Sequence, residues 1–231
     1  MNELDKNNLD YSNVLSAVAY DMRNSLTIMF QALHTLSSQT SKLKTMEEDE
    51  LADFNYQVQR LNGGLTQLMA LYSVKNNKIT TNITEQSIAE LLESVICQND
   101  LYTKSKNIEI EIDVEEDIYW AVDLDLISYL LDDVLSNAIH YSSALIKMSF
   151  TVVDNMLNIK IEDDSAGYPA RMLEAADAPL EKLVGNFGRI GIGLLFSKLI
   201  VLSHQNNNKH GKIMLSNASS LGGSSFILQL P

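Results

Sequence analysis

Two stretches of the N-terminal part repeat apolar residues at the spacing of packed helices. The first stretch has a seven-residue period, and the second alternates spacings of three and four. The rows are Leu15, Met22, Met29 and Leu36, then Leu51, Phe54, Val58, Leu61, Leu65, Leu68 and Tyr72. This period is typical of helices that pack along a narrow apolar seam. The polar stretch between them, residues 37–49, predicts a hairpin connection.

A single hairpin with such a narrow seam does not close a core. The simplest solution is a homodimer in which two hairpins form a four-helix bundle. Gly63 and Gly64 fall inside the second helix, where each glycine costs about 1 kcal/mol relative to alanine. We interpret the pair as a local bend. The predicted dimerisation domain covers residues 1–78.

Residues 79–231 show a mixed pattern of helices and strands. A helix is predicted from about residue 85 to 104, capped by Thr81 or Thr84. A second, strongly apolar helix covers 124–141, and a third covers about 191–203. Alternating patterns predict strands, with a hairpin turn at Asp154-Asn155 between two of them. These strands are 108–114, 117–122, 146–153, 156–162, 212–216 and 225–230. The pattern indicates a mixed sheet covered on one face by helices.

Composition excludes several classes of function. The chain has 17 Lys and Arg against 30 Asp and Glu, a net charge of −13, which argues against sequence-independent binding to nucleic acid. The single cysteine, Cys97, excludes an internal disulfide and a multi-cysteine zinc site. No apolar run is long enough to span a bilayer, and the polar N-terminus is unlike a signal peptide. We therefore expect a cytoplasmic protein with no membrane or nucleic-acid partner.

Four motifs in the second part carry candidate chemistry. Asp133 and Asn137 lie four residues apart on one helix face, an arrangement that can hold Mg²⁺. An acidic run follows a predicted strand, and glycines open the third helix, where backbone N–H groups can approach phosphate. A glycine pair then precedes the final strand. These last three motifs are Glu162-Asp163-Asp164-Ser165-Ala166-Gly167, Gly188-Arg189-Ile190-Gly191-Ile192-Gly193-Leu194 and Gly222-Gly223-Ser224-Ser225-Phe226. Each is weak alone, but their order and separations are specific.

Taken together, residues 10–231 resemble the catalytic core of bacterial sensor histidine kinases. That family joins a dimerising helical hairpin to an ATP-binding α/β sandwich, which it shares with gyrase and the Hsp90 chaperones. The resemblance implies Mg²⁺ at Asn137 and a hydrogen bond from the adenine amino group to Asp163. It also implies nucleotide contacts at His140, Tyr141, Gly167, Gly191, Gly193 and Leu194. The implied fold class is α plus α+β, a helical hairpin followed by an ATPase-like sandwich, and the implied cofactor is ATP with Mg²⁺.

The sequence departs from the family at the phosphoacceptor. Residues 18–26 resemble the acceptor box, but Tyr20 stands at the histidine position. A phenol with a pKa of about 10 is a poor substitute for an imidazole nucleophile. Asp21 and Asn24 remain, and they match a motif that the family uses to dephosphorylate response regulators. The alternative is a pair of surface residues with no role.

Other departures affect the ATP site. His140 replaces a lysine and Ser165 a glycine, while Arg189 interrupts the phosphate-loop glycines. Asp133 replaces an asparagine, and it stands where the gyrase and Hsp90 branches place a general base. A substitution without catalytic role is the alternative reading. His204 and His210 are expected in an exposed polar loop.

The sequence therefore predicts an autokinase-defective histidine-kinase homologue. It would dimerise, bind a response-regulator receiver domain along the helix face of Tyr20, and dephosphorylate or sequester it. Three alternatives stay open. They are a phosphotransfer protein, an active kinase with an unconventional acceptor, and a non-enzymatic dimeric scaffold.

Overall fold

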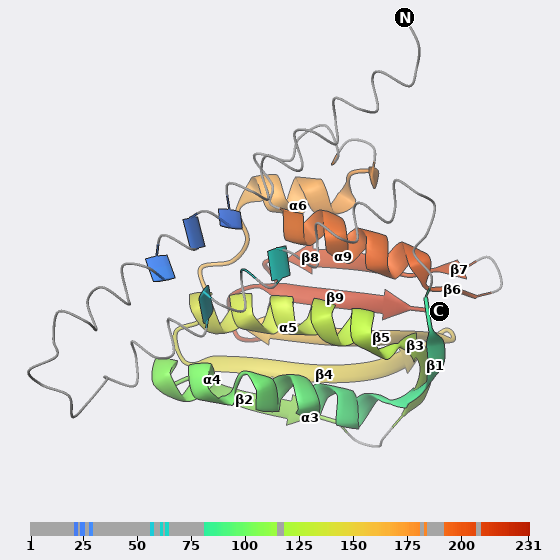
Figure 1. Cartoon of the computed structure of the whole chain (residues 1–231), viewed down its shortest axis with the longest axis horizontal. Coiled ribbons are helices and arrows are strands. Elements are labelled where there is room, and N and C mark those ends of the chain that lie inside the picture. The colour runs from blue at the N-terminus through green and yellow to red at the C-terminus, as the bar shows by residue number, and fades with distance from the viewer. Residues whose placement is uncertain are drawn as a thin grey trace, which may run out of the picture.

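A computed structural model shows a mixed sheet with helices packed across one of its faces (Figure 1). The structure describes residues 81–114, 118–180, 183, 192–206 and 209–231. Within the first 80 residues it describes Asp21, Met22, Asn24, Ser25, Ile28, Met29, Tyr56, Gln57, Leu61, Gly63 and Gly64, all of them helical. The predicted hairpin connection and most of the predicted seam lie outside the described residues.

Five strands form the main sheet, in the order β2-β4-β5-β9-β8. β2 (Glu109–Asp113) runs parallel to β4 (Leu145–Val153), and every other pairing is antiparallel. The remaining strands of this sheet are β5 (Met156–Asp163), β8 (Lys212–Ser216) and β9 (Ser225–Leu230). The predicted alternation of apolar and polar residues thus identified all five strands.

Helices α3 (Ile88–Gln98), α5 (Leu124–Tyr141) and α9 (Ile192–Ser203) cover one face of the sheet (Figure 1). α4 (Asp100–Lys106) and α6 (Ala170–Asp177) are shorter. Two further pairs of strands lie outside the main sheet, β1 (Ile83–Ser87) with β3 (Tyr119–Asp123) and β6 (Gln205–Asn206) with β7 (Lys209–His210). Among the described residues, no helix has both the length and the apolarity that crossing a membrane requires.

The core lies between these helices and the sheet. Leu131, Leu135 and Ile139 of α5 are at most 1% exposed, as are Ile146 and Ile159 of the sheet. Full burial of one such side chain contributes roughly 1.5–3 kcal/mol relative to leaving it in water. α5 therefore forms the central contact between the helical layer and the sheet, and its predicted bounds are confirmed.

The hairpin turn between β4 and β5 is also as predicted. Asp154 has φ 53° and Asn155 has φ 56°. Two successive residues with positive φ are the hallmark of a type I′ turn, which matches the twist of the strands that it joins.

The predicted helix over 85–104 is wrong in two ways. Residues 83–87 form β1, because they pair with β3, and the helix begins only after Ser87, whose hydroxyl accepts a hydrogen bond from Glu90 N at 3.1 Å. The helix then ends at Asn99, which is 1% exposed and donates to both Val95 O and Asp132 Oδ1. Pairing with a distant strand overrides the local helical pattern.

His204 is buried, contrary to the prediction of an exposed loop, and is only 2% exposed. Asp123 N donates to its Nε2 at 3.0 Å, so Nδ1 carries the hydrogen and donates to Ile200 O at 2.8 Å. Asp123 in turn caps α5 by accepting from Leu126 N. The ring therefore joins the end of α9 to the start of α5.

We expect His204→Ala to lower the free energy of unfolding by about 2–3 kcal/mol, because it leaves Asp123 N unpaired and opens a cavity. His210→Ala is the matched control, since His210 is exposed, and it should change stability by less than about 0.5 kcal/mol. Urea denaturation followed by circular dichroism measures both. Equal effects of the two substitutions would contradict this role for His204.

Candidate functional site

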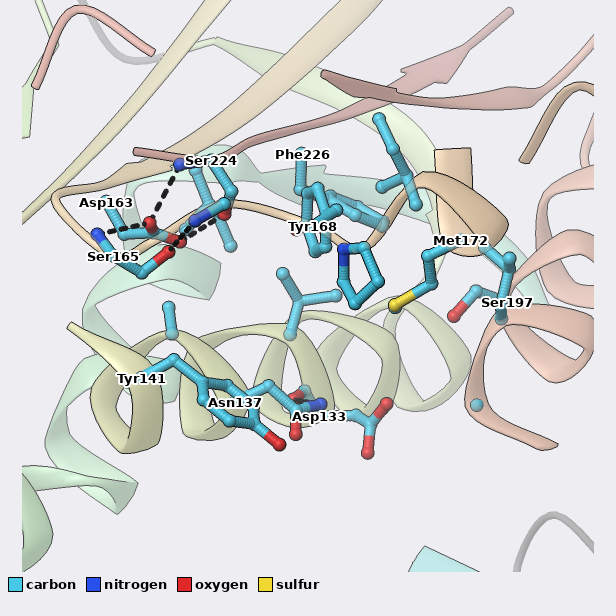
Figure 2. Close-up of a pocket in the computed structure, with 18 of the residues that line it drawn as sticks. Asp133, Asn137, Tyr141, Asp163, Ser165, Tyr168, Met172, Ser197, Ser224 and Phe226 are labelled. Atoms are coloured by element: carbon cyan, nitrogen blue, oxygen red, sulfur yellow. Dashed lines mark hydrogen bonds between the residues drawn. The ribbon is translucent and has the colours of Figure 1, made fainter. Parts of the chain in front are cut away.

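A cavity of about 520 Å³ opens above α5. Figure 2 shows the part of its wall that comes from α5, the loop after β5, α6, α9 and β9. Helical residues 21, 22, 25, 63 and 64 complete the lining. The lining includes Asp21, Met22, Ser25, Gly63, Gly64, Asp133, Asn137, Tyr141, Asp163, Ser165, Gly167, Tyr168, Arg171, Met172, Gly193, Leu194, Ser197, Ser224 and Phe226. The volume falls within the usual range of small-molecule sites.

Most of the predicted site residues that the structure describes meet in this cavity. They are Asp21, Asp133, Asn137, Tyr141, Asp163, Gly167, Gly193 and Leu194. His140 and Asn24 do not line it, although both are described. Tyr20 and Gly191 lie outside the described residues. Asp133, Asn137 and Tyr141 share one helix, and they lie on the cavity side of α5 in Figure 2.

Asp163 is held in one orientation by three donors. Its Oδ1 accepts from Ser165 N at 3.0 Å and from Ser224 N at 2.9 Å, and its Oδ2 accepts from the Ser224 hydroxyl. An ionised carboxylate has about four acceptor positions, so one remains for a ligand. Asp163 is 5% exposed, which makes it a buried acceptor at the end of β5.

Gly223 allows this arrangement. A Cβ at Gly223 would lie 2.4 Å from Ser165 N and 2.5 Å from Asp163 O, distances too short for any side chain. Gly223, in the glycine motif before the last strand, therefore allows Ser224 to reach the Asp163 carboxylate of the acidic motif. The sequence analysis noted both motifs and missed this contact.

Asn137 is oriented by its own helix. Its Nδ2 donates to the Asp133 backbone carbonyl at 2.7 Å, which leaves Oδ1 as the amide atom available for a cation. The Asp133 carboxylate lines the same cavity, and oxygen ligands suit Mg²⁺. The described residues include no group of three His, Cys, Asp or Glu that could hold a metal. The oxygen atoms of Asn137 and Asp133 thus fit a Mg²⁺ ion whose other ligands come from a bound molecule.

The loop after β5 is fixed by two side chains that the sequence analysis did not assign. Asp164 accepts from the backbone N–H groups of Ser143 and Ala144 at 2.8 and 2.9 Å, which ties the loop to the end of α5. Asn217 accepts from Tyr168 N at 2.7 Å and donates to Tyr168 O at 3.0 Å. The loop after β5 is therefore held to the segment after α5 by Asp164 and to the segment after β8 by Asn217.

His140, which the family resemblance placed near the nucleotide, packs against the N-terminal helices. Its ring stacks on Tyr56 with a centroid distance of 5.1 Å and an interplanar angle of 3°. Tyr56 also stacks on Tyr102 at 5.0 Å, and the Tyr102 hydroxyl lies 3.0 Å from His140 Nδ1. Tyr56 is 6% exposed, so these rings form a buried contact between the helical part and the α/β domain.

Gly63 lies close to the same face of α5. A Cβ at this position would lie 2.7 Å from the Tyr129 hydroxyl, so glycine permits the close approach. Met22 of the predicted seam packs against buried residues of α6 and α9, among them Ala175 and Leu194. The helices that carry Met22 and Gly63 thus form one wall of the cavity, and the glycine pair in an apolar helix was the sequence signal for it.

Comparison with curated proteins gives a family likeness. No protein-family model matches the chain. Sensor histidine kinase CssS of Bacillus subtilis is 35% identical over 119 residues, which are 52% of this chain and 26% of CssS. Sensor protein kinase WalK of Staphylococcus haemolyticus is 24% identical over 220 residues, 91% of this chain and 35% of WalK. The chain therefore spans about a quarter to a third of the length of these relatives.

Solved structures agree on the fold. Histidine kinase AdeS of Acinetobacter baumannii matches with a TM-score of 0.61 at 23% identity, over 91% of this chain and 96% of that one. Histidine kinase ThkA, in its complex with response regulator protein TrrA, matches with a TM-score of 0.64 at 18% identity, over 99% of this chain and 64% of ThkA. The chain is homologous to sensor histidine kinases and has the fold of their catalytic cores, including the α+β ATPase-like domain.

We expect Tyr56→Ala to loosen the helical part from the α/β domain, because it removes both ring contacts and leaves a cavity. The free energy of unfolding should fall by about 3 kcal/mol, and amide exchange should rise in α4 and at the end of α5. Tyr56→Phe keeps the rings and is the matched control. Unchanged exchange in Tyr56→Ala would contradict this contact.

Proposed function

We propose that this chain is a histidine-kinase-like signalling module that binds Mg²⁺-ATP in the cavity and a response-regulator receiver domain on its N-terminal helices, but lacks histidine autophosphorylation. The observation that carries the proposal is the meeting of Asp163, Asn137 and Gly193 with Asp21 in one cavity. Asp21 directly follows the position at which the homologous kinases have their acceptor histidine.

Three features support ATP at this site. The remaining acceptor position of Asp163 suits the adenine amino group, and the oxygens of Asn137 and Asp133 suit Mg²⁺. Gly193 and Leu194 lie in the first turn of α9, where a helix N-terminus favours phosphate. Bound ATP would supply the phosphoryl group, and the chain's own residues would orient the base and the metal.

The helical part supports a partner rather than autophosphorylation. Tyr20 supplies a phenol in place of the acceptor imidazole, so the usual chemistry has no nucleophile. Asn24 is exposed on its helix and does not line the cavity, so it is accessible to a bound protein. ThkA was solved in complex with a response regulator, which favours a receiver domain as the partner class. The module would act as a cytoplasmic homodimer that dephosphorylates or sequesters that receiver.

We expect Mg²⁺-ATP to bind the parent protein, and Asp163→Asn to weaken that binding by about 10- to 100-fold, because a charge-assisted hydrogen bond to the base is lost. Isothermal titration calorimetry measures the affinities. Glu174→Gln, an exposed change on α6 outside the cavity, serves as the control. Equal affinities for the parent and Asp163→Asn would show that the base lies elsewhere.

Incubation with labelled ATP should leave no phosphohistidine on the parent, and Tyr20→His should introduce one. The substitution supplies an imidazole with a pKa of about 6.5 beside the Asp21 carboxylate, which can accept its proton. Mass spectrometry at position 20 locates the label. Phosphohistidine on the parent would refute the proposed loss of histidine autophosphorylation, and an unlabelled Tyr20→His that still binds ATP would place a second defect in the ATP domain.

A further inference from the structure

Two buried serines line the cavity and have no part in the contacts described so far. Ser25, four residues after Asp21, is 3% exposed, and Ser197 of α9 is 4% exposed. Both are lining residues of the cavity. Figure 2 shows Ser197 beside Met172, across the cavity from Asp163. The cavity therefore has a polar group at the end opposite the Asp163 carboxylate.

Met22 places Ser25 near the same end. The two residues are three apart, so their side chains lie on one helix face. Met22 packs against the buried cluster that contains Ala175 of α6 and Leu194 of α9. Leu194 in turn precedes Ser197 by three residues on α9. The two serines thus reach the cavity from the N-terminal helical part and from α9, on either side of this apolar contact.

The hydroxyls of both serines are available to a ligand. No hydrogen bond joins the hydroxyl of Ser25 or Ser197 to another described residue. A hydroxyl that is buried without a partner costs about 1–3 kcal/mol. Since both residues line the cavity, a bound molecule can accept a hydrogen bond from each of them.

The surroundings of this end suit an anion. Arg171, beside Met172 in the first turn of α6, is exposed and is the one cationic side chain among the described residues that line the cavity. Ser197 follows Gly193 by four residues, so it lies one turn from the start of α9. A guanidinium group and a helix N-terminus both favour negative charge. Together they favour a phosphate over an uncharged sugar as the partner of the two hydroxyls.

We propose that Ser25 and Ser197 bind the phosphate chain of the nucleotide, each by donating a hydrogen bond from its hydroxyl to a phosphate oxygen. The proposal rests on the proposed nucleotide site, in which Asp163 receives the base. A nucleotide whose base lies at Asp163 extends its phosphates toward the end of the cavity that Ser197 lines. Because Ser25 belongs to the N-terminal helical part, the phosphates contact both parts of the chain.

The test compares Mg²⁺-ATP with adenosine, which has the base and the sugar but no phosphate. Ser25→Ala and Ser197→Ala should each weaken ATP binding about tenfold and leave adenosine binding unchanged, because each removes one hydrogen bond to a charged phosphate. Isothermal titration calorimetry measures ATP, and titration followed by nuclear magnetic resonance measures adenosine. Ser143→Ala makes the same chemical change at an exposed serine outside the cavity, and it should alter neither affinity.

Thermal melting separates this role from a structural one. Both serines are helical, and alanine is the better helix former, so Ser25→Ala and Ser197→Ala should melt at or above the temperature of the parent. A variant that melts at a lower temperature and binds ATP as tightly as the parent would show that its hydroxyl stabilises the fold instead.

Two binding results would overturn the inference. One is an unchanged ATP affinity in both folded variants, and the other is an equal loss for adenosine, which would place the hydroxyls against the base or the sugar. If ATP binding still depends on Asp163 in either case, the nucleotide site stands and this inference alone fails. If the parent binds neither ATP nor adenosine, the proposed function fails together with the inference.

Discussion

The site depends on one buried carboxylate and the three donors that hold it. Asp163 is the last residue of β5, and Ser224 immediately precedes β9, the neighbouring strand. Because Ser224 gives Asp163 two hydrogen bonds, the carboxylate has a fixed direction before any ligand arrives. A buried acceptor that is only partly used by the protein is expensive to leave without a partner. The three hydrogen bonds thus join the end of β5 to the start of β9, and they leave one acceptor position of the carboxylate open to the cavity.

Backbone geometry makes that centre possible. There is no room for a Cβ at position 223 beside Asp163, so this position needs a glycine. Gly167 has a positive φ, and the next residue, Tyr168, donates its backbone N–H to Asn217. Asp164 anchors the same loop to the end of α5 through backbone N–H groups. The loop after β5 therefore has side-chain contacts to two separate segments, α5 and the turn after β8. Its position relative to Asn137 follows from these contacts.

Local patterns in the sequence were sufficient for the five strands of the main sheet and for α5, and most of the predicted site residues that the structure describes line one cavity. The alternation of apolar side chains and the turn residues Asp154-Asn155 encode the sheet directly. The pairing of β1 with β3 and the burial of His204 depend on partners far away along the chain, and no local pattern reports them. The same reason hid Asn217 and Tyr56, whose contacts join segments distant in sequence. Elements that one local pattern encodes were thus predictable, and contacts between distant segments were not.

The N-terminal helical residues contact the α/β domain through Tyr56 and Gly63. Tyr56 stacks on His140 and on Tyr102, and Gly63 approaches Tyr129, so these contacts join the N-terminal helical residues to α5 and α4. His140, which the resemblance noted in the sequence analysis placed near a nucleotide, packs its ring against Tyr56 and does not line the cavity. The contacts of Tyr56 and Gly63 thus place Asp21 and Met22 at the cavity, while Asn24 is exposed and lies outside the cavity.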